Sequence, residues 1–277
     1  MQCVPDDSQN KWIRSTSASI IHSLRNFCAN NEKMECAYAE TLTVQELKDF
    51  ILKNRDADIL HVSGHGYYDR KNNLAGLMVG HEFWMGDDND YRVPPVVILS
   101  ACHVSPRGSG VVNVADMFIR AGAEAVLGTF VPVDAQRNMI LINRLYTYIN
   151  EAPKGCKMYK TLSEAWSGVV ATNAIHEIAA SSQKFFQWIM GKNDNGELRL
   201  MDFSMKRCPG RLHGSSMYKD TIAIVKEMLH EEGMDGKFDD ILSQDDYFPE
   251  SFFYQWIGFP ENIHLYNELF EKVTENT

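Results

Sequence analysis

Two apolar stretches that end in reactive side chains decide the fold: DILHVSGHG (Asp58–Gly66) and PVVILSACH (Pro95–His103). A third apolar stretch, AVLGTFV (Ala125–Val131), follows them. Continuous apolar strands are typical of parallel sheets that are covered on both faces. Because open α/β folds place their active sites at the carboxyl ends of such strands, we expect His65 and Cys102 to face one crevice.

The segments between these strands have the spacing of helices, which predicts an α/β fold with a mostly parallel sheet flanked by helices. Thr43 followed by Glu46 forms a capping box, which marks the start of one helix. The segment Asp69–Arg92 is predicted to be a hairpin or crossover with a mobile tip at Gly86–Asp90. The remaining elements of this part are a short strand at Glu35–Glu40 and helices at Thr16–Phe27, Val112–Ala121 (C-capped by Gly122) and Ala135–Asn150.

The chain changes character after Lys192, where turn residues replace the periodic pattern. This change predicts two domains, residues 1–192 and a helical C-terminal accessory region of residues 193–277, part of or appended to the first. The first domain would end with one long amphipathic helix at Leu162–Met190. The accessory region would hold helices at Tyr218–Glu232 and Asn262–Val273, with an acidic, aromatic linker at Tyr247–Trp256 between them.

The composition is that of a folded protein and argues against a nucleic-acid partner. The chain has 277 residues, which suffice for a large buried core, and 44% hydrophobic residues, which exclude a mainly disordered chain. A net charge of −10 argues against a nucleic-acid partner, which would need a basic face. No secretory signal or membrane-spanning apolar stretch is visible. Six cysteines without a C-x-x-C pair favour a reducing cytoplasm over a disulfide scaffold.

His65 and Cys102 have the chemistry of a cysteine peptidase. A neutral imidazole beside a thiol can take its proton, and the resulting thiolate can attack an amide. The backbone N–H groups of Gly66 and Cys102 are candidate oxyanion donors, and the small side chains of Ser63, Gly64 and Gly66 leave room for a peptide. The alternative is that Cys102 is a small buried apolar residue and His65 an ordinary loop histidine.

A metal site is a weaker interpretation of the same histidines. His61 and His65 are four residues apart along a strand, so their side chains would not converge on one ion. We therefore expect His61 to be a core histidine and His103 to lie in the substrate cleft or in solvent. His176-Glu177 resembles the start of a zinc-binding helix, but Ala180 stands where the second histidine should be. We predict no metal and no cofactor.

Four motifs in this order resemble the CHAT domain family: LHxxGHG (60–66), LSAC (99–102), AxxFxxAGA (115–123) and VxxTxxPVD (126–134). The members of this family are caspase-like and separase-like cysteine peptidases of the caspase–haemoglobinase fold, common in bacteria. The resemblance covers roughly Met34 to Ala180. It implies a caspase-like three-layer sandwich and a Cys–His dyad, His65 and Cys102, without an obligatory third member.

The resemblance also implies that Asp134 lies near the pocket for the residue before the cleaved bond, where an acid would favour Arg or Lys. Asp134 is equally well interpreted as the N-cap of the helix that follows it. Two segments depart from the family pattern, His103-Val104 and Phe130-Val131, and these departures put the substrate preference in doubt.

The function predicted from these features is a regulated intracellular cysteine endopeptidase that cuts a specific protein partner in bacterial antiviral defence or signalling. A regulatory or sensor protein of the repeat-containing kind is an expected partner, whereas membranes and nucleic acid are not. The C-terminal aromatic residues Phe252, Phe253, Tyr254 and Trp256 either anchor such a partner or belong to an ordinary core. The main alternative function is a catalytically silent caspase-like scaffold, and a zinc hydrolase comes third.

Overall fold

The computed structural model describes residues 1–266 except 9, 33, 86–90, 107, 109–110, 153–158, 214–215 and 237–248. The chain forms two compact units, Met1–Trp166 with Phe252–Thr277, and Ser167–Ser251. The domain division predicted after Lys192 stays a prediction. The tip predicted at Gly86–Asp90 and most of the helix predicted at Asn262–Val273 lie outside the described residues.

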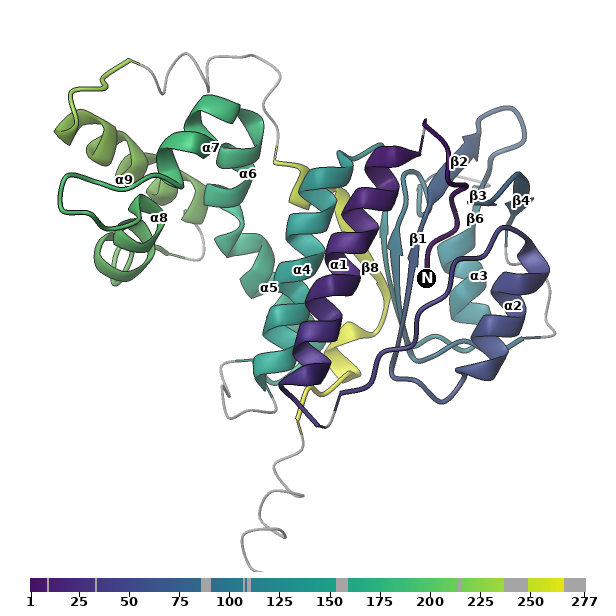
Figure 1. Ribbon diagram of the computed structural model, residues 1–277. Helices are drawn as coiled ribbons and strands as arrows, with labels where there is room; N and C mark the ends of the chain where they lie inside the picture. Colours follow the sequence, from purple (N-terminus) through teal and green to yellow (C-terminus); the bar gives the residue numbers. More distant parts are fainter. Residues whose placement is uncertain are drawn as a thin grey trace, which may run out of the picture. The chain divides into compact units, whose positions relative to one another are not determined.

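The central sheet of the first unit has the strand order β1-β5-β7-β8 (Figure 1). Strands β1 (Ile59–Ser63), β5 (Val96–Ser100) and β7 (Ala125–Thr129) are parallel, and their positions confirm the three predicted strands. Strand β8 (Tyr254–Gly258) is antiparallel to β7 and lies at the edge. The linker predicted at Tyr247–Trp256 therefore ends in a strand, which pairs with β7. The rings of Tyr254 and Trp256 pack against that of Trp166. The predicted mostly parallel sheet is confirmed.

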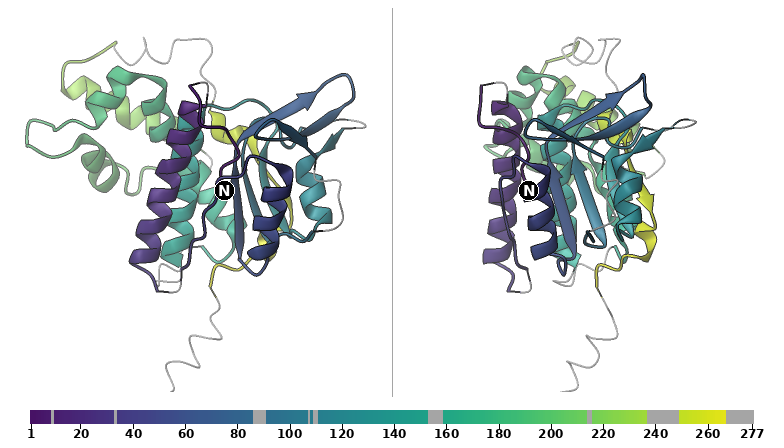
Figure 2. Two further views of the ribbon diagram at one scale, coloured as in Figure 1. Left: turned by 45° about the vertical axis from the view of Figure 1, so that its right-hand side comes forward. Right: turned by 90° about the vertical axis from the view of Figure 1, so that its right-hand side faces the viewer.

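Helices cover both faces of this sheet, which confirms the predicted three-layer sandwich (Figures 1 and 2). Helices α1 (Lys11–Ala29) and α4 (Ala135–Glu151) lie side by side on one face. Helices α2 (Val44–Lys53) and α3 (Val114–Arg120) pack on the other. Successive side chains of β5 point to opposite faces of the sheet, as the pleat of a strand requires. Val97 lies on the face that packs against α2 and α3.

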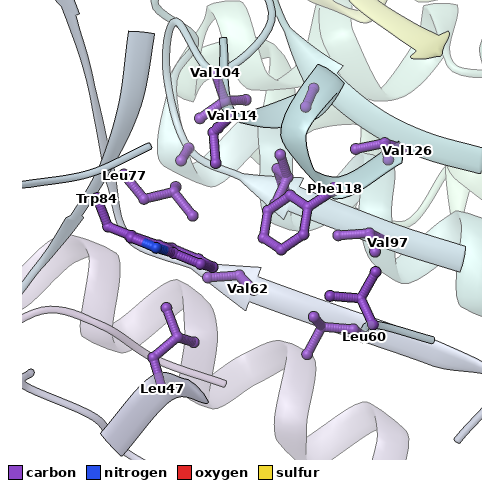
Figure 3. Packing of buried hydrophobic residues seen from close by; sticks show 14 of the residues in the cluster. Leu47, Leu60, Val62, Leu77, Trp84, Val97, Val104, Val114, Phe118 and Val126 are labelled. Carbon is purple, nitrogen blue, oxygen red and sulfur yellow. The ribbon is translucent and has the colours of Figure 1, made fainter. Parts of the chain in front are cut away.

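The core between the sheet and helices α2 and α3 is fully apolar at its centre (Figure 3). Leu47 and Phe118 project from the helices onto Val62 and Val97 of the sheet, and all four side chains are completely buried. Truncating a buried aromatic residue such as Phe118 costs about 3–5 kcal/mol, so this cluster stabilises the layer that carries β1 and β5.

Both helix signals that we identified in this layer are confirmed. The Thr43 hydroxyl accepts a hydrogen bond from the Glu46 backbone N–H at 3.2 Å, and the Glu46 carboxylate accepts one from the Thr43 N–H at 3.2 Å. Gly122 follows the end of α3 with φ = 107°, a left-handed conformation in which a side chain would be strained.

The first unit contains a second, smaller sheet, which begins directly after β1. It consists of β2 (His65–Asp69), β3 (Leu74–Val79) and β4 (Glu82–Trp84), which are antiparallel, with β6 (Val112–Asn113) parallel to β3. The predicted hairpin is confirmed. The strand predicted to run through His65 instead divides at Gly64, so that His65 begins a strand of a different sheet. In the expected strand at Glu35–Glu40, only Glu40 pairs, through a bridge to Gln2.

The segment predicted as one helix at Leu162–Met190 is three helices: α5 (Leu162–Thr172), α6 (Ala174–Ser181) and α7 (Gln183–Ile189). Ser182 interrupts the run with extended backbone and caps α7 by accepting a hydrogen bond from the Phe185 N–H. Most of this segment belongs to the second unit, with α8 (Arg199–Asp202), the π-helix η2 (Phe203–Arg207) and α9 (Met217–Glu231). Helix α9 confirms the helix predicted at Tyr218–Glu232.

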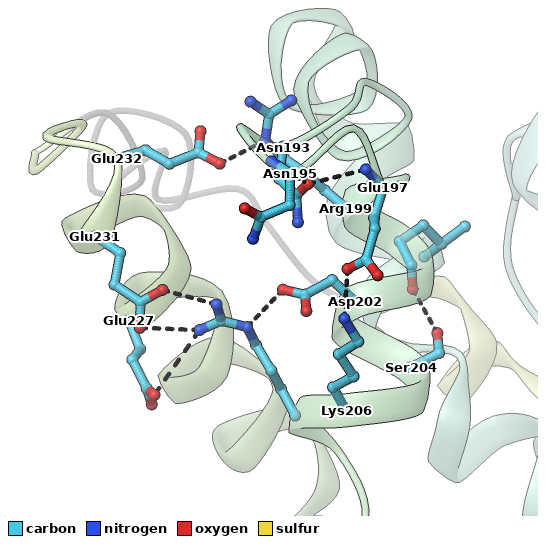
Figure 4. Close-up of polar contacts among 12 residues, drawn as sticks. Asn193, Asn195, Glu197, Arg199, Asp202, Ser204, Lys206, Glu227, Glu231 and Glu232 are labelled. Carbon is cyan, nitrogen blue, oxygen red and sulfur yellow. Dashed lines mark hydrogen bonds and ion pairs between the residues drawn. The ribbon is translucent and has the colours of Figure 1, made fainter.

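Arginine–carboxylate pairs join the helices of the second unit (Figure 4). Arg207 donates to Asp202 at 2.7 Å and to Glu231 at 2.7 Å, and Arg199 donates to Glu232 at 2.6 Å. The Arg199–Glu232 and Arg207–Asp202 pairs are only partly exposed, so water screens them less than it would at an open surface. In the described parts of both units, no helix is long and apolar enough to cross a membrane.

Candidate active site

The register between β1 and β5 places His65 and Cys102 at the same edge of the sheet. Ser63 and Ser100 are paired at the carboxyl ends of the two strands, and the Gly64 N–H donates to the Ser100 carbonyl at 3.2 Å. His65 and Cys102 each stand two residues beyond this pair. His65 and Cys102 thus each follow the carboxyl end of one of two adjacent parallel strands at the same distance along the chain.

Gly66 brings the His65 segment into direct backbone contact with Cys102. A Cβ atom built on Gly66 would lie 1.5 Å from the Cys102 carbonyl oxygen and 2.7 Å from its carbonyl carbon. Only glycine leaves room for such a close approach. The backbone contact therefore explains why position 66 is a glycine, independently of the predicted role of its N–H as an oxyanion donor.

The Cys102 thiol is half-buried and lies against the backbone of Val133. The Val133 N–H points to Sγ at 3.4 Å, and Sγ lies 3.7 Å from the Val133 carbonyl oxygen. The thiol can donate to the carbonyl, whereas a thiolate would accept from the N–H. One residue thus offers a partner for each protonation state, and a hydrogen bond from an N–H group favours the charged form.

Hydrogen bonds from β7 and β8 fix the loop that carries Cys102. The Thr129 hydroxyl donates to the Ala101 carbonyl at 2.9 Å, and the Ser105 N–H donates to the Thr129 carbonyl at 3.0 Å. The Gln255 side chain donates to the Ser105 carbonyl at 3.0 Å. The loop is therefore held on both sides of Cys102.

His103, the residue after Cys102, has φ = 54°, a left-handed conformation that costs a residue with a side chain on the order of 1 kcal/mol. Its half-buried ring lies 6.4 Å from that of Tyr68 in β2. His103 is thus beside the small sheet that begins at His65, where the predicted contact with a substrate remains a hypothesis.

The His65 side chain is exposed, and its Nε2 lies 2.7 Å from Oδ1 of Asn10. Asn10 is only 7% exposed and directly precedes α1. Asn10 could not be recognised from the sequence, because the predicted helix begins only at Thr16 and nothing in the spacing points to a residue 55 positions away.

Asp134 is the N-cap of α4, and its carboxylate accepts hydrogen bonds from the N–H groups of Gln136 at 2.9 Å and Arg137 at 3.0 Å. The structure thus confirms this interpretation. Asp134 is also exposed and directly follows Val133, the residue in contact with the Cys102 thiol. The predicted role in substrate preference is compatible with the cap.

Two other predicted residues lie on the face of the sheet that packs against α1 and α4. Ser63 is 6% exposed and its hydroxyl is hydrogen-bonded to that of Ser17 in α1, which speaks against the predicted contact with a substrate. His61 Nε2 lies 2.8 Å from the Ser100 hydroxyl. Burial lowers the pKa of His61 to about 3, so its ring is neutral, in agreement with a core histidine.

Within the described ranges, no group of three or more His, Cys, Asp or Glu side chains could hold a metal ion. Glu177, part of the apparent zinc motif, is buried in the second unit, where its carboxylate accepts hydrogen bonds from the Ser251 N–H at 2.7 Å and the Tyr218 hydroxyl. Its position in the helix therefore has a structural explanation.

A model of the CHAT domain matches residues 13–192 of the chain. This range contains His65, Cys102 and Asp134. A search among curated proteins finds no match.

Proposed function

The chain belongs to the CHAT domain family, and from this premise we propose that it is a cysteine endopeptidase in which Cys102 is the nucleophile and His65 its base. The observation that carries the proposal is the backbone contact between Gly66 and Cys102, which keeps the residue next to His65 against the nucleophile. A caspase-like fold with these two residues at one sheet edge is suited to acyl transfer.

In the proposed reaction, the neutral His65 ring takes the proton from the Cys102 thiol, and the thiolate attacks the carbonyl carbon of the cleaved peptide bond. The N–H groups of Gly66 and Cys102 are the proposed donors to the oxyanion. The imidazolium then gives its proton to the leaving amine, which leaves an acyl group on Sγ. Water hydrolyses this thioester with His65 again as the base.

The proposed substrate is a specific protein partner with Arg or Lys before the cleaved bond. Asp134 supports this preference, because it is exposed, acidic and adjacent to the residue that contacts the thiol. We further propose that the activity is intracellular and regulated by a sensor protein, in a bacterial defence or signalling pathway. The sensor protein and the pathway rest on the family alone, whereas the intracellular location rests on the cysteine pattern.

The first experiment measures the reactivity of Cys102 with peptides that carry an electrophile after Arg, Lys, Asp, Asn or Met, with mass spectrometry locating the label. Cys36 is a built-in control, since it is exposed whereas Cys102 is half-buried. Access alone would favour Cys36, so preferential labelling of Cys102 would indicate chemical activation. Replacing His65 by Ala is expected to slow this labelling about 100-fold.

The variant His81→Ala is the matched control for His65→Ala, because His81 is an exposed histidine outside the site. It should label Cys102 at the wild-type rate. If Cys102 reacts no faster than Cys36, with candidate partner proteins present as well as absent, the endopeptidase proposal fails and the scaffold becomes the better interpretation.

A further inference from the structure

Asn10 occupies the N-cap position of α1 and yet makes no capping hydrogen bond. Asparagine is among the best N-cap residues because its side chain can accept from a free N–H of the first turn, and such a bond stabilises a helix by about 1 kcal/mol. The Asn10 side chain forgoes this bond and points its Oδ1 at Nε2 of His65 instead. Helix stability therefore does not explain why the Asn10 side chain contacts His65.

Asp7 determines which end of the Asn10 amide faces His65. The Asn10 Nδ2 donates to both carboxylate oxygens of Asp7, each at 3.0 Å, and the Asn10 backbone N–H donates to Oδ1 at 3.0 Å. Rotating the amide by half a turn would place Oδ1 against a carboxylate, which is repulsive. The atom that faces His65 is therefore the oxygen, which only accepts hydrogen bonds.

An acceptor at 2.7 Å from Nε2 requires that Nε2 carry the hydrogen. A neutral imidazole has a single ring hydrogen, so Nδ1 is then unprotonated and is the atom able to take a proton.

We propose that Asn10, oriented by Asp7, is a positioning residue that keeps His65 in the Nε2–H tautomer and leaves Nδ1 as the basic atom toward Cys102. The base step rests on the proposed function, whereas the tautomer does not. When Nδ1 takes the thiol proton, the bond from Nε2 to Asn10 becomes charge-assisted and stronger, and the Asp7 carboxylate lies behind it. The proposed Cys–His pair thereby gains a third member.

The start of α1 is held firmly enough for this role. Arg14, one turn further along, donates to the Val4 carbonyl at 3.1 Å and to the Glu40 carboxylate at 3.0 Å, and its N–H donates to the Asn10 carbonyl at 3.0 Å. Arg14 also pairs with Asp6 at 3.3 Å. A group that orients a catalytic base must itself be held in place, and these bonds supply that support.

The variant Asn10→Ser separates positioning from helix stability. Serine caps a helix as well as asparagine does, so the variant should be as stable as the wild type to within about 1 kcal/mol in denaturant unfolding. Its side chain is too short to reach His65. We expect labelling of Cys102 to slow about 10- to 100-fold in Asn10→Ser and not to change further when Asn10→Ser is added to His65→Ala.

The ring nitrogens of His65, observed by ¹⁵N NMR in the full chain at about pH 8, test the tautomer without any substrate. The His65→Ala variant assigns the signals. We expect the hydrogen on Nε2 in the wild type and a mixture of tautomers in Asn10→Ser. A hydrogen on Nδ1 in the wild type, or an unchanged tautomer in Asn10→Ser, overturns the inference. If Cys102 is unreactive but the tautomers behave as expected, the proposed function fails and the role of Asn10 in orienting His65 stands.

Discussion

Replacing Gly66 by Ala tests whether the backbone contact with Cys102 shapes the site. The new Cβ would lie 1.5 Å from the Cys102 carbonyl oxygen, whereas a carbon and a carbonyl oxygen in contact need about 3.3 Å. The His65 segment and the Cys102 loop must therefore move apart by about 1.8 Å. The carbonyl belongs to the backbone, so no side-chain rotation can relieve the overlap.

Two quantities should change in Gly66→Ala. Overpacking of this kind costs about 1–3 kcal/mol of unfolding free energy, to be measured by urea titration. A misplacement of about 1 Å can cost 100-fold in rate, so labelling of Cys102 should fall at least that far. Because the residual rate is then that of an unassisted thiol, the further change His65→Ala should have no effect.

The matched control is Gly64→Ala, two residues earlier. A Cβ there would meet the Cys3 Cβ at 3.3 Å and the Met78 carbonyl oxygen at 3.5 Å, which the neighbours can accommodate by small shifts. This variant should keep most of its stability and reactivity. Equal behaviour of Gly66→Ala and Gly64→Ala would refute the reasoning, because the two positions differ mainly in the contact with Cys102.

Three further predictions concern single side chains. The pKa of His61 is about 3 in the folded protein and near 6.5 in the unfolded chain. Between these pH values the unfolded state binds one more proton, so the free energy of unfolding decreases as the pH falls from about 6.5 to 3. In His61→Gln, the decline in unfolding free energy between pH 6 and 4 should be shallower by up to about 1.4 kcal/mol per pH unit, and an equal slope would contradict this assignment. Asp134→Asn keeps the N-cap but loses the charge, so thermal stability should be unchanged while probes with Arg or Lys lose about tenfold in rate relative to Met; an unchanged probe profile would leave Asp134 a cap alone. Thr43→Ala removes one half of the capping box of α2 and should cost about 1 kcal/mol in urea unfolding, with a negligible loss indicating that water replaces the cap.

The sequence predicted those parts of the fold that follow from local patterns. The three parallel strands are continuous apolar runs, and the cap of α2 is a signal four residues long, so both could be recognised without the structure. Strand β8 could not, because YQWIG is short and its pairing with β7 depends on residues far away in the chain. The single helix expected at Leu162–Met190 was wrong for a related reason. Helical periodicity continues across Asn173 and Ser182, although α6 begins after the first and Ser182 has extended backbone and caps α7.

In the candidate site, too, contacts between segments that are far apart in the chain could not be predicted from local patterns. His65 and Cys102 stand at strand ends and could be predicted from that position, and Gly66 from its lack of a side chain. Asn10 contacts His65 through a fold that joins distant segments, and Val133 contacts the thiol through its backbone, which any residue except proline provides. Ser63 was expected to face a substrate, but the alternation of side chains along β1 turns it toward α1.

The place of β8 in the chain affects when the site is completed during synthesis. The Cys102 loop depends on Gln255 for one of its anchors, and the whole of Ser167–Ser251 is translated between β7 and that residue. At elongation rates of about 5–20 residues per second, the nascent protein carries Cys102 on a partly anchored loop for on the order of ten seconds. The Cys102 loop therefore gains its last anchor only after the second unit has been synthesised. If translation stops within that unit, the released chain has a Cys102 loop without the hydrogen bond from Gln255.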